Sequence, residues 1–314
     1  MTGRAPWSWW TGFICVAAAL CVIACGPRSE RYRATPPSAM QQEWDRVHDM
    51  AQQGRTDEAL AGYLSLCEGH AMARACYDHA RLLFEAGKEA EGRTRTLAFV
   101  RAYPQHALVQ PAVKRIARSY RSAGEQNEGI DVLERLAEEV KGSESWDTIE
   151  YARAGLFRSI PDLEGERAVL MRVVDAGRWG SQLWDNAIWR AVEIARAQKK
   201  PDEEKKLIRR MLDAREESRL IASYHSPHYD DGLLRLGVLY EEEGNVDKAL
   251  STWRELIRWK TSRLRDDALL RTARLFKQQG DMRQACRHLQ RLLDEMGDSS
   301  SAREARKLRV DWGC

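Results

Sequence analysis

The 314-residue chain contains two stretches near its C-terminal end that share one pattern, 36 residues apart. Each stretch has a small residue, an aromatic residue, a glycine and an alanine at the same spacings. The first set is Gly237, Tyr240, Gly244 and Ala249, and the second is Ala273, Phe276, Gly280 and Ala285. A pattern that returns at such a period indicates a stack of similar units, because one unit cannot bury its apolar face alone. This repeat constrains the fold more than any other feature.

These spacings resemble those of the tetratricopeptide repeat, and the resemblance implies a helix hairpin in each unit. The glycine supplies the left-handed backbone that ends the first helix, and the small residues let the two helices approach closely. The aromatic residue fills the gap between neighbouring hairpins. The composition favours helix, since Ala, Leu, Arg and Glu dominate and there are nine prolines. With 43% hydrophobic and 31% charged residues, the chain is too apolar to be disordered and too charged to be a multi-pass membrane protein.

The repeated residues resemble the tetratricopeptide repeat, a helix–turn–helix unit of about 34 residues. The resemblance implies an all-α, right-handed solenoid of about seven hairpins over residues 39–297. Units two and three match more loosely, with turn glycines at Gly87 and Gly124. The first unit has Gly54 but lacks the small residue of the first helix, because Val47 stands there.

The middle of the chain departs furthest from the pattern. No turn glycine recurs at the expected spacing between Gly124 and Gly244. Two degenerate hairpins, units four and five, fit this interval, with turns predicted near residues 159–162 and 198–202. Residues 298–314 are expected to hold a capping helix that shields the final hairpin.

The N-terminus has the form of an export signal. Arg4 is the only charged residue before an apolar stretch over residues 7–24. The sequence Val-Ile-Ala-Cys at residues 22–25 resembles the lipobox of bacterial lipoproteins. That resemblance implies removal of residues 1–24 as a signal peptide and lipidation of Cys25. The alternative is an uncleaved anchor that spans the membrane.

The residues after the lipobox predict where the mature chain lies. In the sorting pattern of bacterial lipoproteins, an aspartate after the lipidated cysteine retains the protein in the inner membrane. Gly26 stands there in this chain, which favours a lipid anchor in the outer membrane and a domain that faces the periplasm. Residues 25–38 are rich in Gly, Pro, Arg and Ser and predict a flexible tether.

Four cysteines remain in the predicted mature chain besides Cys25. Outside the cytoplasm, an even number of cysteines predicts disulfides. The helical interpretation favours Cys67 with Cys76, across the turn between two units, and Cys286 with Cys314, across the turn before the capping helix. The alternative is four independent buried thiols. The spacings do not match a zinc site.

The sequence lacks the common catalytic motifs. It has no G-x-S-x-G, no Walker A loop, no H-E-x-x-H and no serine–lysine pair, so we expect no enzyme, no metal and no cofactor. Two His and two Asp between His225 and Asp231 could bind a divalent ion, but a loop followed by a helix cap is the preferred interpretation. Trp179, Trp184 and Trp189 are expected to pack between hairpins, with a ligand shelf as the alternative.

The resemblance to tetratricopeptide repeats also implies a binding groove. In that family, residues of the first helix of each hairpin line the concave side. Carried onto units two and three, these places form a basic and aromatic strip that suits an acidic peptide or another anionic polymer. The alternative is an ordinary charged surface. The groove residues are Arg74, Tyr77, Arg81, Phe84, Lys114, Arg118 and Arg121.

These expectations together predict a scaffold that binds a protein partner in the bacterial envelope. The net charge of +3 gives no strong field that would single out nucleic acid. In layout the chain is similar to the tetratricopeptide lipoprotein of the β-barrel assembly machinery of the outer membrane. The alternative is a non-catalytic helper of the cell wall, because the superhelical domain of soluble lytic transglycosylases has a similar helical layout.

Overall fold

The computed structural model describes residues 38–216 and 223–314. In these residues the chain forms fifteen α-helices and, outside them, one isolated antiparallel bridge between Glu216 and Tyr224. Fourteen helices pair into seven hairpins, and the last helix is single. The structure thus confirms an all-α solenoid of about seven hairpins with a C-terminal capping helix. Over the same residues, no helix combines the length and the apolar character needed to cross a membrane.

The first helices of the hairpins begin 34 to 38 residues apart, except for the 45 residues from α10 to α12. This near-constant period is the repeat that the sequence shows most clearly at its C-terminal end. The first helices and the capping helix are α2 (Ala39–Gln52), α4 (Ala73–Glu85), α6 (Val109–Ala123), α8 (Trp146–Ser159), α10 (Trp184–Ala197), α12 (Tyr229–Glu242), α14 (Arg265–Gln278) and α16 (Ala302–Asp311).

The second helices follow after short turns. In units four and five the turns lie at residues 160–162 and 198–200, within the ranges that the sequence predicts. The second helices are α3 (Thr56–His70), α5 (Glu89–Ala102), α7 (Gln126–Glu139), α9 (Leu163–Asp175), α11 (Pro201–Asp213), α13 (Val246–Arg258) and α15 (Met282–Met296).

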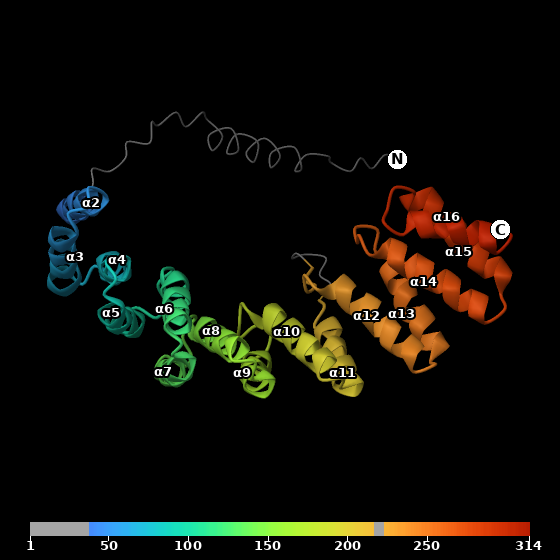
Figure 1. Cartoon of the computed structure of the whole chain (residues 1–314), viewed down its shortest axis with the longest axis horizontal. Helices are drawn as coiled ribbons and strands as arrows, with labels where there is room; N and C mark the ends of the chain where they lie inside the picture. Colours follow the sequence, from blue (N-terminus) through green and yellow to red (C-terminus); the bar gives the residue numbers. More distant parts are fainter. Residues whose placement is uncertain (1–37, 217–222) are drawn as a thin grey trace, which may run out of the picture.

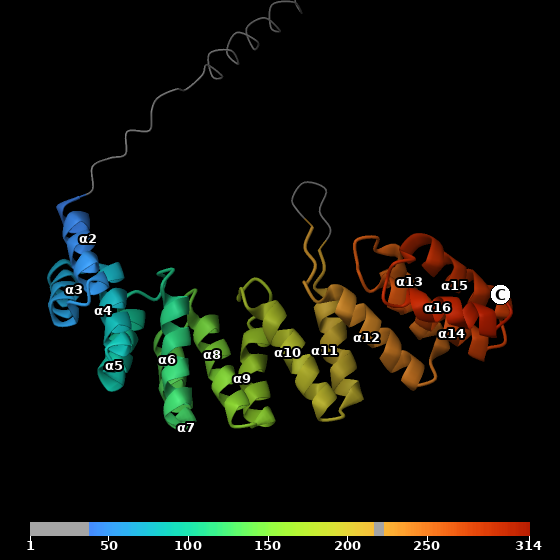
Figure 2. The ribbon, with the colours of Figure 1, turned by 45° about the horizontal axis from the view of Figure 1, so that its top comes forward.

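The hairpins form one curved row (Figure 1). In this view α4 and α6 lie on the inner side of the curve, and α5 and α7 lie on the outer side. Figure 2 shows the same row, with the connection that follows α9 and the described residues 214–216 and 223–228 projecting from one edge. The first helices therefore border the inner side of the curve in this part of the molecule.

The buried residues form three clusters along the row. The first joins α2, α3 and α4 around Trp44 and Tyr63, and the second joins α4 to α8 around Phe99 and Leu133. The third and largest runs from α8 to α16 and includes Trp253. Because each cluster involves helices that are close in sequence, stability is built from neighbour to neighbour, as in other solenoids.

The turn residues explain why units four and five lack the glycine of the repeat pattern in their sequence. In the other five hairpins a glycine with φ between 71° and 81° ends the first helix, as at Gly244. The corresponding residues in units four and five are Pro161 and Lys199. Lys199 adopts the left-handed conformation itself, with φ of 55°, so the turn is made without its usual sequence signal.

A second substitution distinguishes the same two units. In the other hairpins the fourth residue of the second helix is small and buried, as at Ala249 and Ala285. Units four and five have Glu166 and Glu204 at this place, with 0% and 1% of their surface exposed. A buried charge requires partners, and both glutamates have two arginines.

The two glutamates have matching partners. Arg158 of α8 donates to Glu166 through Nε (2.7 Å), and Arg190 of α10 donates through Nε and a terminal nitrogen (2.8 and 3.0 Å). Glu204 accepts in the same way from Arg196 of α10 (2.8 Å) and Arg235 of α12 (2.7 and 2.9 Å). We call these two groups the arginine–glutamate clamps. Each clamp joins the first helices of two successive hairpins through the second helix between them.

Both cysteine pairs form disulfides in the structure, with the connectivity that the sequence favours. Cys67 of α3 and Cys76 of α4 have Cα atoms 4.7 Å apart, and Cys286 of α15 and Cys314 have Cα atoms 5.5 Å apart. Cys67 packs against both the first and the second buried cluster. The first disulfide therefore joins the two clusters covalently.

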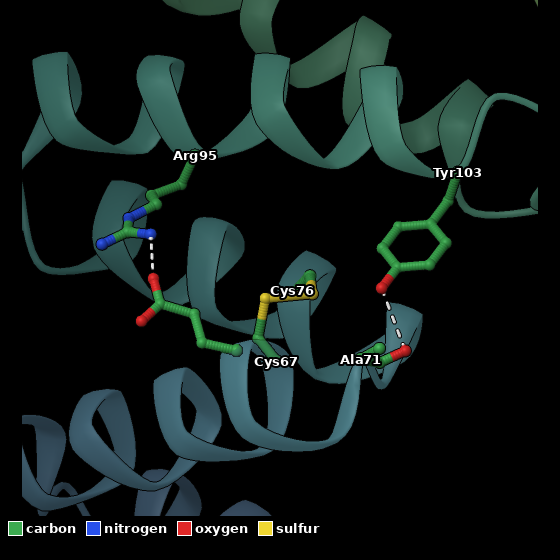
Figure 3. Close-up of a disulfide and its surroundings, with 6 residues drawn as sticks. Cys67, Ala71, Cys76, Arg95 and Tyr103 are labelled. Atoms are coloured by element: carbon green, nitrogen blue, oxygen red, sulfur yellow. Dashed lines mark hydrogen bonds and ion pairs between the residues drawn. A yellow bond between two sulfur atoms is a disulfide. The ribbon is translucent and has the colours of Figure 1, made fainter.

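Polar contacts surround the first disulfide (Figure 3). Arg95 of α5 pairs with Glu68 at the end of α3 (2.7 Å). The hydroxyl of Tyr103, which follows α5, donates to the carbonyl of Ala71 between α3 and α4 (2.9 Å). Ala71 has a left-handed backbone (φ 50°). The turn that contains it is held by the Cys67–Cys76 disulfide and by the side chains of Arg95 in α5 and Tyr103 just after α5.

Candidate partner-binding face

The predicted groove residues of α4 are engaged within their own part of the fold. Arg81 is half-buried and pairs with Asp78 (3.2 Å) and Glu85 (2.8 Å) on the same helix. Arg74 lies over the ring of Trp44, 3.7 Å from its centroid. The positive charges of α4 are thus largely neutralised or covered, which leaves little for an anionic ligand.

The two aromatic residues of α4 take part in packing between helices. Tyr77 is half-buried, with its ring 5.9 Å from that of Phe99 in α5. Phe84 lies against Gly92 of α5, where an added Cβ would come within 3.0 Å of the ring. Glycine at position 92 therefore lets α5 approach Phe84 closely, and both aromatic side chains contribute to the core between α4 and α5.

The groove residues of α6, unlike those of α4, are not engaged by neighbouring side chains within residues 38–216 and 223–314. Lys114, Arg118 and Arg121 are exposed and recur at the i, i+4 and i+7 places, which lie on one face of a helix. The opposite face is buried and includes Ile116 and Tyr120. Across the described part of the chain, none of the three cations has an acidic side chain within ion-pair distance. We call these three residues the basic strip.

The absence of acidic residues explains why the basic strip has no ion pairs. Of the fifteen described helices, α6 alone contains no Asp or Glu, and no acid occurs anywhere in residues 92–124. The cations of α5 in this stretch take their partners from outside residues 92–124: Arg93 pairs with Glu125 in the turn before α7, and Arg101 pairs with Glu139 of α7 (2.6 Å). No neighbouring helix supplies such a partner to the basic strip.

The geometry of the basic strip suits a linear anionic ligand. With a rise of about 1.5 Å per residue, Lys114 and Arg121 lie about 10 Å apart along the axis of α6. Of the helices around it, α6 packs on α5, α7 and α8, and in Figure 1 it borders the inner side of the curve. Carboxylates of a bound segment can therefore pair with all three cations at once.

The region around His225 and Asp231 is organised by ring stacking and hydrogen bonds. The His225 ring lies 4.6 Å from that of Trp259, and the His228 ring stacks on Trp189 at 5.1 Å. Asp230 accepts a hydrogen bond from Ser262 (2.9 Å). The part of the chain that the structure describes holds no group of three or more residues placed to bind a metal ion.

The three tryptophans in and just before unit five differ in their surroundings. Trp184 is buried and donates to the carbonyl of Val174 (3.1 Å), and Trp189 is half-buried against His228. These two side chains pack between hairpins, as expected. For Trp179 the expectation of packing is wrong, because 83% of its surface is exposed.

The predicted lipidation site and signal peptide lie outside the described residues. Cys25, residues 1–24 and almost all of the tether over residues 25–38 belong to the undescribed N-terminal part. They remain predictions from the lipobox alone. The first described helix, α2, begins at Ala39.

Comparison with known proteins identifies the repeats at the C-terminal end. A tetratricopeptide repeat family model matches residues 231–258 and 267–303, which cover most of α12 to α15. These two hairpins match the tetratricopeptide repeat, and the other five have a similar helix–turn–helix arrangement. The chain is therefore a helical-repeat protein, of the class whose known members commonly act as binding scaffolds. No curated protein matches it.

Several solved structures resemble the chain at low identity. A tetratricopeptide repeat protein from Parabacteroides merdae is 11% identical (TM-score 0.36; 86% of this chain and 98% of that chain covered). PilF of Pseudomonas aeruginosa is 13% identical (TM-score 0.42; 76% and 99%). A chain of the Naa15/Naa10 complex bound to HypK-THB is 12% identical (TM-score 0.48; 87% and 40%). Such similarity concerns the fold alone.

Proposed function

We propose that the mature protein is a lipid-anchored, non-catalytic scaffold of the bacterial envelope that binds an acidic segment of a protein partner through the basic strip. The observation that carries this proposal is the set of three exposed cations on α6 without ion-pair partners among the described residues. Unpaired cations that lie close together repel one another, and an anionic partner relieves that repulsion. Arginine also binds carboxylates with two parallel hydrogen bonds.

The location rests on two independent features. The lipobox at residues 22–25 supports export and lipidation of Cys25, and Gly26 favours the outer membrane. The disulfides Cys67–Cys76 and Cys286–Cys314 fit an oxidising compartment such as the periplasm. A scaffold tethered there suits outer-membrane protein assembly or another branch of envelope biogenesis.

The test is an in-cell crosslinking pull-down with the tagged, full-length protein. In one variant Lys114, Arg118 and Arg121 are changed to Glu. In a matched control with the same change in charge, Arg254, Arg258 and Lys260 are changed to Glu; these are also exposed cations without ion pairs among the described residues. We expect wild type and control to capture the same partner. The variant with Lys114, Arg118 and Arg121 changed to Glu should capture at most one-tenth of the amount of partner that wild type captures.

Two outcomes would contradict the proposal. If the Lys114 variant captures the same partner as wild type, the basic strip is not the binding site. If no protein is captured but isolated peptidoglycan is, the cell-wall helper becomes the better explanation. A Cys25→Ser variant separates anchoring from binding, because it should leave the membrane fraction and lose its lipid label while the purified protein still binds the partner.

A further inference from the structure

Trp179 is the most exposed large apolar side chain in the described part of the chain. It lies in the connection between α9 and α10, between Gly177 and Gly180. An indole open to water gains no packing energy, and tryptophan is enriched among the residues that dominate binding sites. Trp179 is also separate from the basic strip, so the proposed partner segment does not account for it.

The indole of Trp179 is held from one side. The guanidinium of Arg178 lies 4.0 Å from the centroid of the Trp179 ring and 4.0 Å from that of Tyr224, so this cation is stacked between two rings. The Tyr224 hydroxyl donates to Asp185 (2.6 Å), and Arg178 pairs with Glu216. These contacts hold Arg178 against one face of the indole and leave most of the ring open to water, as a surface on which a ligand can stack.

A groove of about 730 Å³ adjoins this surface. Arg178 belongs to both, because its guanidinium contacts Trp179 and its side chain lines the groove. Gly177 and Trp184 form one end, and the exposed face of α11 forms the rest. That face contributes Asp202, Lys205, Lys206, Arg209, Arg210, Asp213 and the adjacent Ala214.

The groove combines cations with carboxylates. Three of its five cations are paired with acids. Lys206 has no ion-pair partner among the described residues, and Arg209 donates to the hydroxyl of Tyr240 (3.0 Å) rather than to an acid. The carboxylates of Asp202 and Asp213 line the same groove. Its lining therefore offers both donors and acceptors, with a surplus of positive charge.

We propose that Trp179 and this groove bind a glycan that carries carboxylate groups. The open face of the indole stacks on the CH face of a pyranose ring. Sugar hydroxyl groups donate to Asp202 and Asp213, and Lys206 and Arg209 bind the carboxylates of the glycan. The volume of the groove is in the range of small-ligand sites and accommodates a few sugar rings.

An acidic polypeptide fits this groove less well. A segment rich in carboxylates has few neutral side-chain donors to place against Asp202 and Asp213, whereas a glycan has its hydroxyl groups, and the lining provides few apolar side chains to receive a peptide. In Figure 1, α11 lies on the outer side of the row and α6 on the inner side. The glycan site and the basic strip are therefore separate, and the glycan site does not depend on the proposed binding of a protein partner.

The probe is a set of peptidoglycan glycan strands from which the peptides have been removed, so that the muramic acid carboxylates are free. Neutral chitin oligosaccharides of similar length are the comparison. Binding to the full-length mature protein in detergent is measured by calorimetry. We expect Trp179→Ala to weaken binding of both probes at least tenfold, and Val310→Ala, which alters another side chain with 82% exposure, to leave both unchanged.

A charge variant tests the role of the carboxylates. Lys206→Glu should weaken binding of the peptide-free strands at least fivefold and leave binding of chitin oligosaccharides unchanged, whereas Lys260→Glu should change neither. The proposal is overturned if wild type binds no strands, or if Trp179→Ala binds them as wild type does. It is also overturned if a poly-glutamate peptide, and no glycan, binds in a Trp179-dependent way.

Discussion

Glu166 and Glu204 show how single residues decide the packing of the middle hairpins. Burial opposes ionisation of Glu166, but the hydrogen bonds from Arg190 and Arg158 outweigh it, so its pKa lies below the usual range. The same balance, with bonds from Arg235 and Arg196, lowers the pKa of Glu204. Both carboxylates are therefore charged in the folded protein, although almost no water reaches them.

Glu166→Gln should destabilise the hairpins that the clamp joins. The amide cannot neutralise Arg158 and Arg190, so we expect the free energy of unfolding of this region to fall by about 2–4 kcal/mol, within or just below the range for broken buried ion pairs. Urea unfolding and hydrogen exchange in α9 measure the loss. Glu164→Gln is the matched control, since Glu164 is exposed and pairs with Lys200 at the surface; its effect should stay below about 0.5 kcal/mol.

The pKa of Glu166 also predicts how the stabilities of wild type and Glu166→Gln differ with pH. A glutamate whose pKa is lower in the folded state stabilises the fold above its unfolded pKa of about 4.3, and this stabilisation is lost as the pH falls through the folded value. Wild type should therefore lose more stability than Glu166→Gln on going from pH 5 to pH 2. Burial raises the pKa of Glu150 despite Arg172 and Arg153, which gives the opposite sign. The difference between the two proteins isolates Glu166, and parallel profiles would contradict the prediction.

The hairpin α12–α13 shows what the repeat pattern requires of a helix pair. Gly237 of α12 faces Trp253 of α13, and a Cβ on Gly237 would collide with the indole ring. Trp253 is fully buried, and its indole nitrogen donates to the carbonyl of Leu234 (3.2 Å). Position 237 therefore requires a residue without a Cβ, because the Trp253 ring of the partner helix occupies the space beside it.

Gly237→Ala should destabilise the protein even though alanine favours helix. We expect a loss of about 1–3 kcal/mol from overpacking against Trp253. The matched control is Gly155→Ala in α8, where an added Cβ has no neighbour within 4 Å; it should stabilise by up to about 1 kcal/mol. Thermal and urea unfolding distinguish the two variants, and equal effects would refute the role assigned to the close approach.

The sequence predicts the hairpins well where apolar and small residues define them. The turn glycines and the small residues of units six and seven lie where the pattern places them. Units four and five carry no such signal, because Lys199 makes a turn without glycine and Glu166 replaces a small residue with a charge whose partners lie 8 and 24 residues away. Charge pairing across helices cannot be derived from a repeat pattern.

The candidate site was predictable only in part. Its cations are visible in the sequence, and the lack of any acid in residues 92–124 could have been found there too. What the sequence does not show is which cations are neutralised. Arg81 has acids on its own helix, Arg93 has Glu125 from the turn before α7, and Lys114 has neither kind of partner among the described residues. That distinction depends on how neighbouring hairpins pack.

At the scale of the molecule, the described hairpins form a row in which helices pack chiefly on helices near them in sequence. We expect the two clamps to make one unit of this row removable. Arg190 and Arg235 occupy corresponding places and bind their glutamates with nearly the same distances. Deletion of residues 184–228 removes α10 and α11 and brings Arg235 to the place of Arg190, opposite Glu166. We expect the shortened protein to fold with a re-formed clamp.

Circular dichroism and thermal unfolding test the deletion. The shortened protein should keep a cooperative transition, and the same deletion with Arg235→Gln should lose about 2–4 kcal/mol relative to it. A shortened protein that is unfolded, or that is indifferent to Arg235, would show that the clamps are not equivalent.

Interchangeable clamps would also allow the number of hairpins to change during evolution. A duplication or loss of one unit between α9 and α12 would preserve every bond of the joint, so the number of middle hairpins can change in a single genetic event. Each added hairpin would move the far end of the row further from the lipid anchor proposed at Cys25, without altering α6 or the capping helix. If the proposed anchor holds the protein at a membrane, selection could in this way adjust how far the row of hairpins extends from it, while the proposed binding residues stay the same.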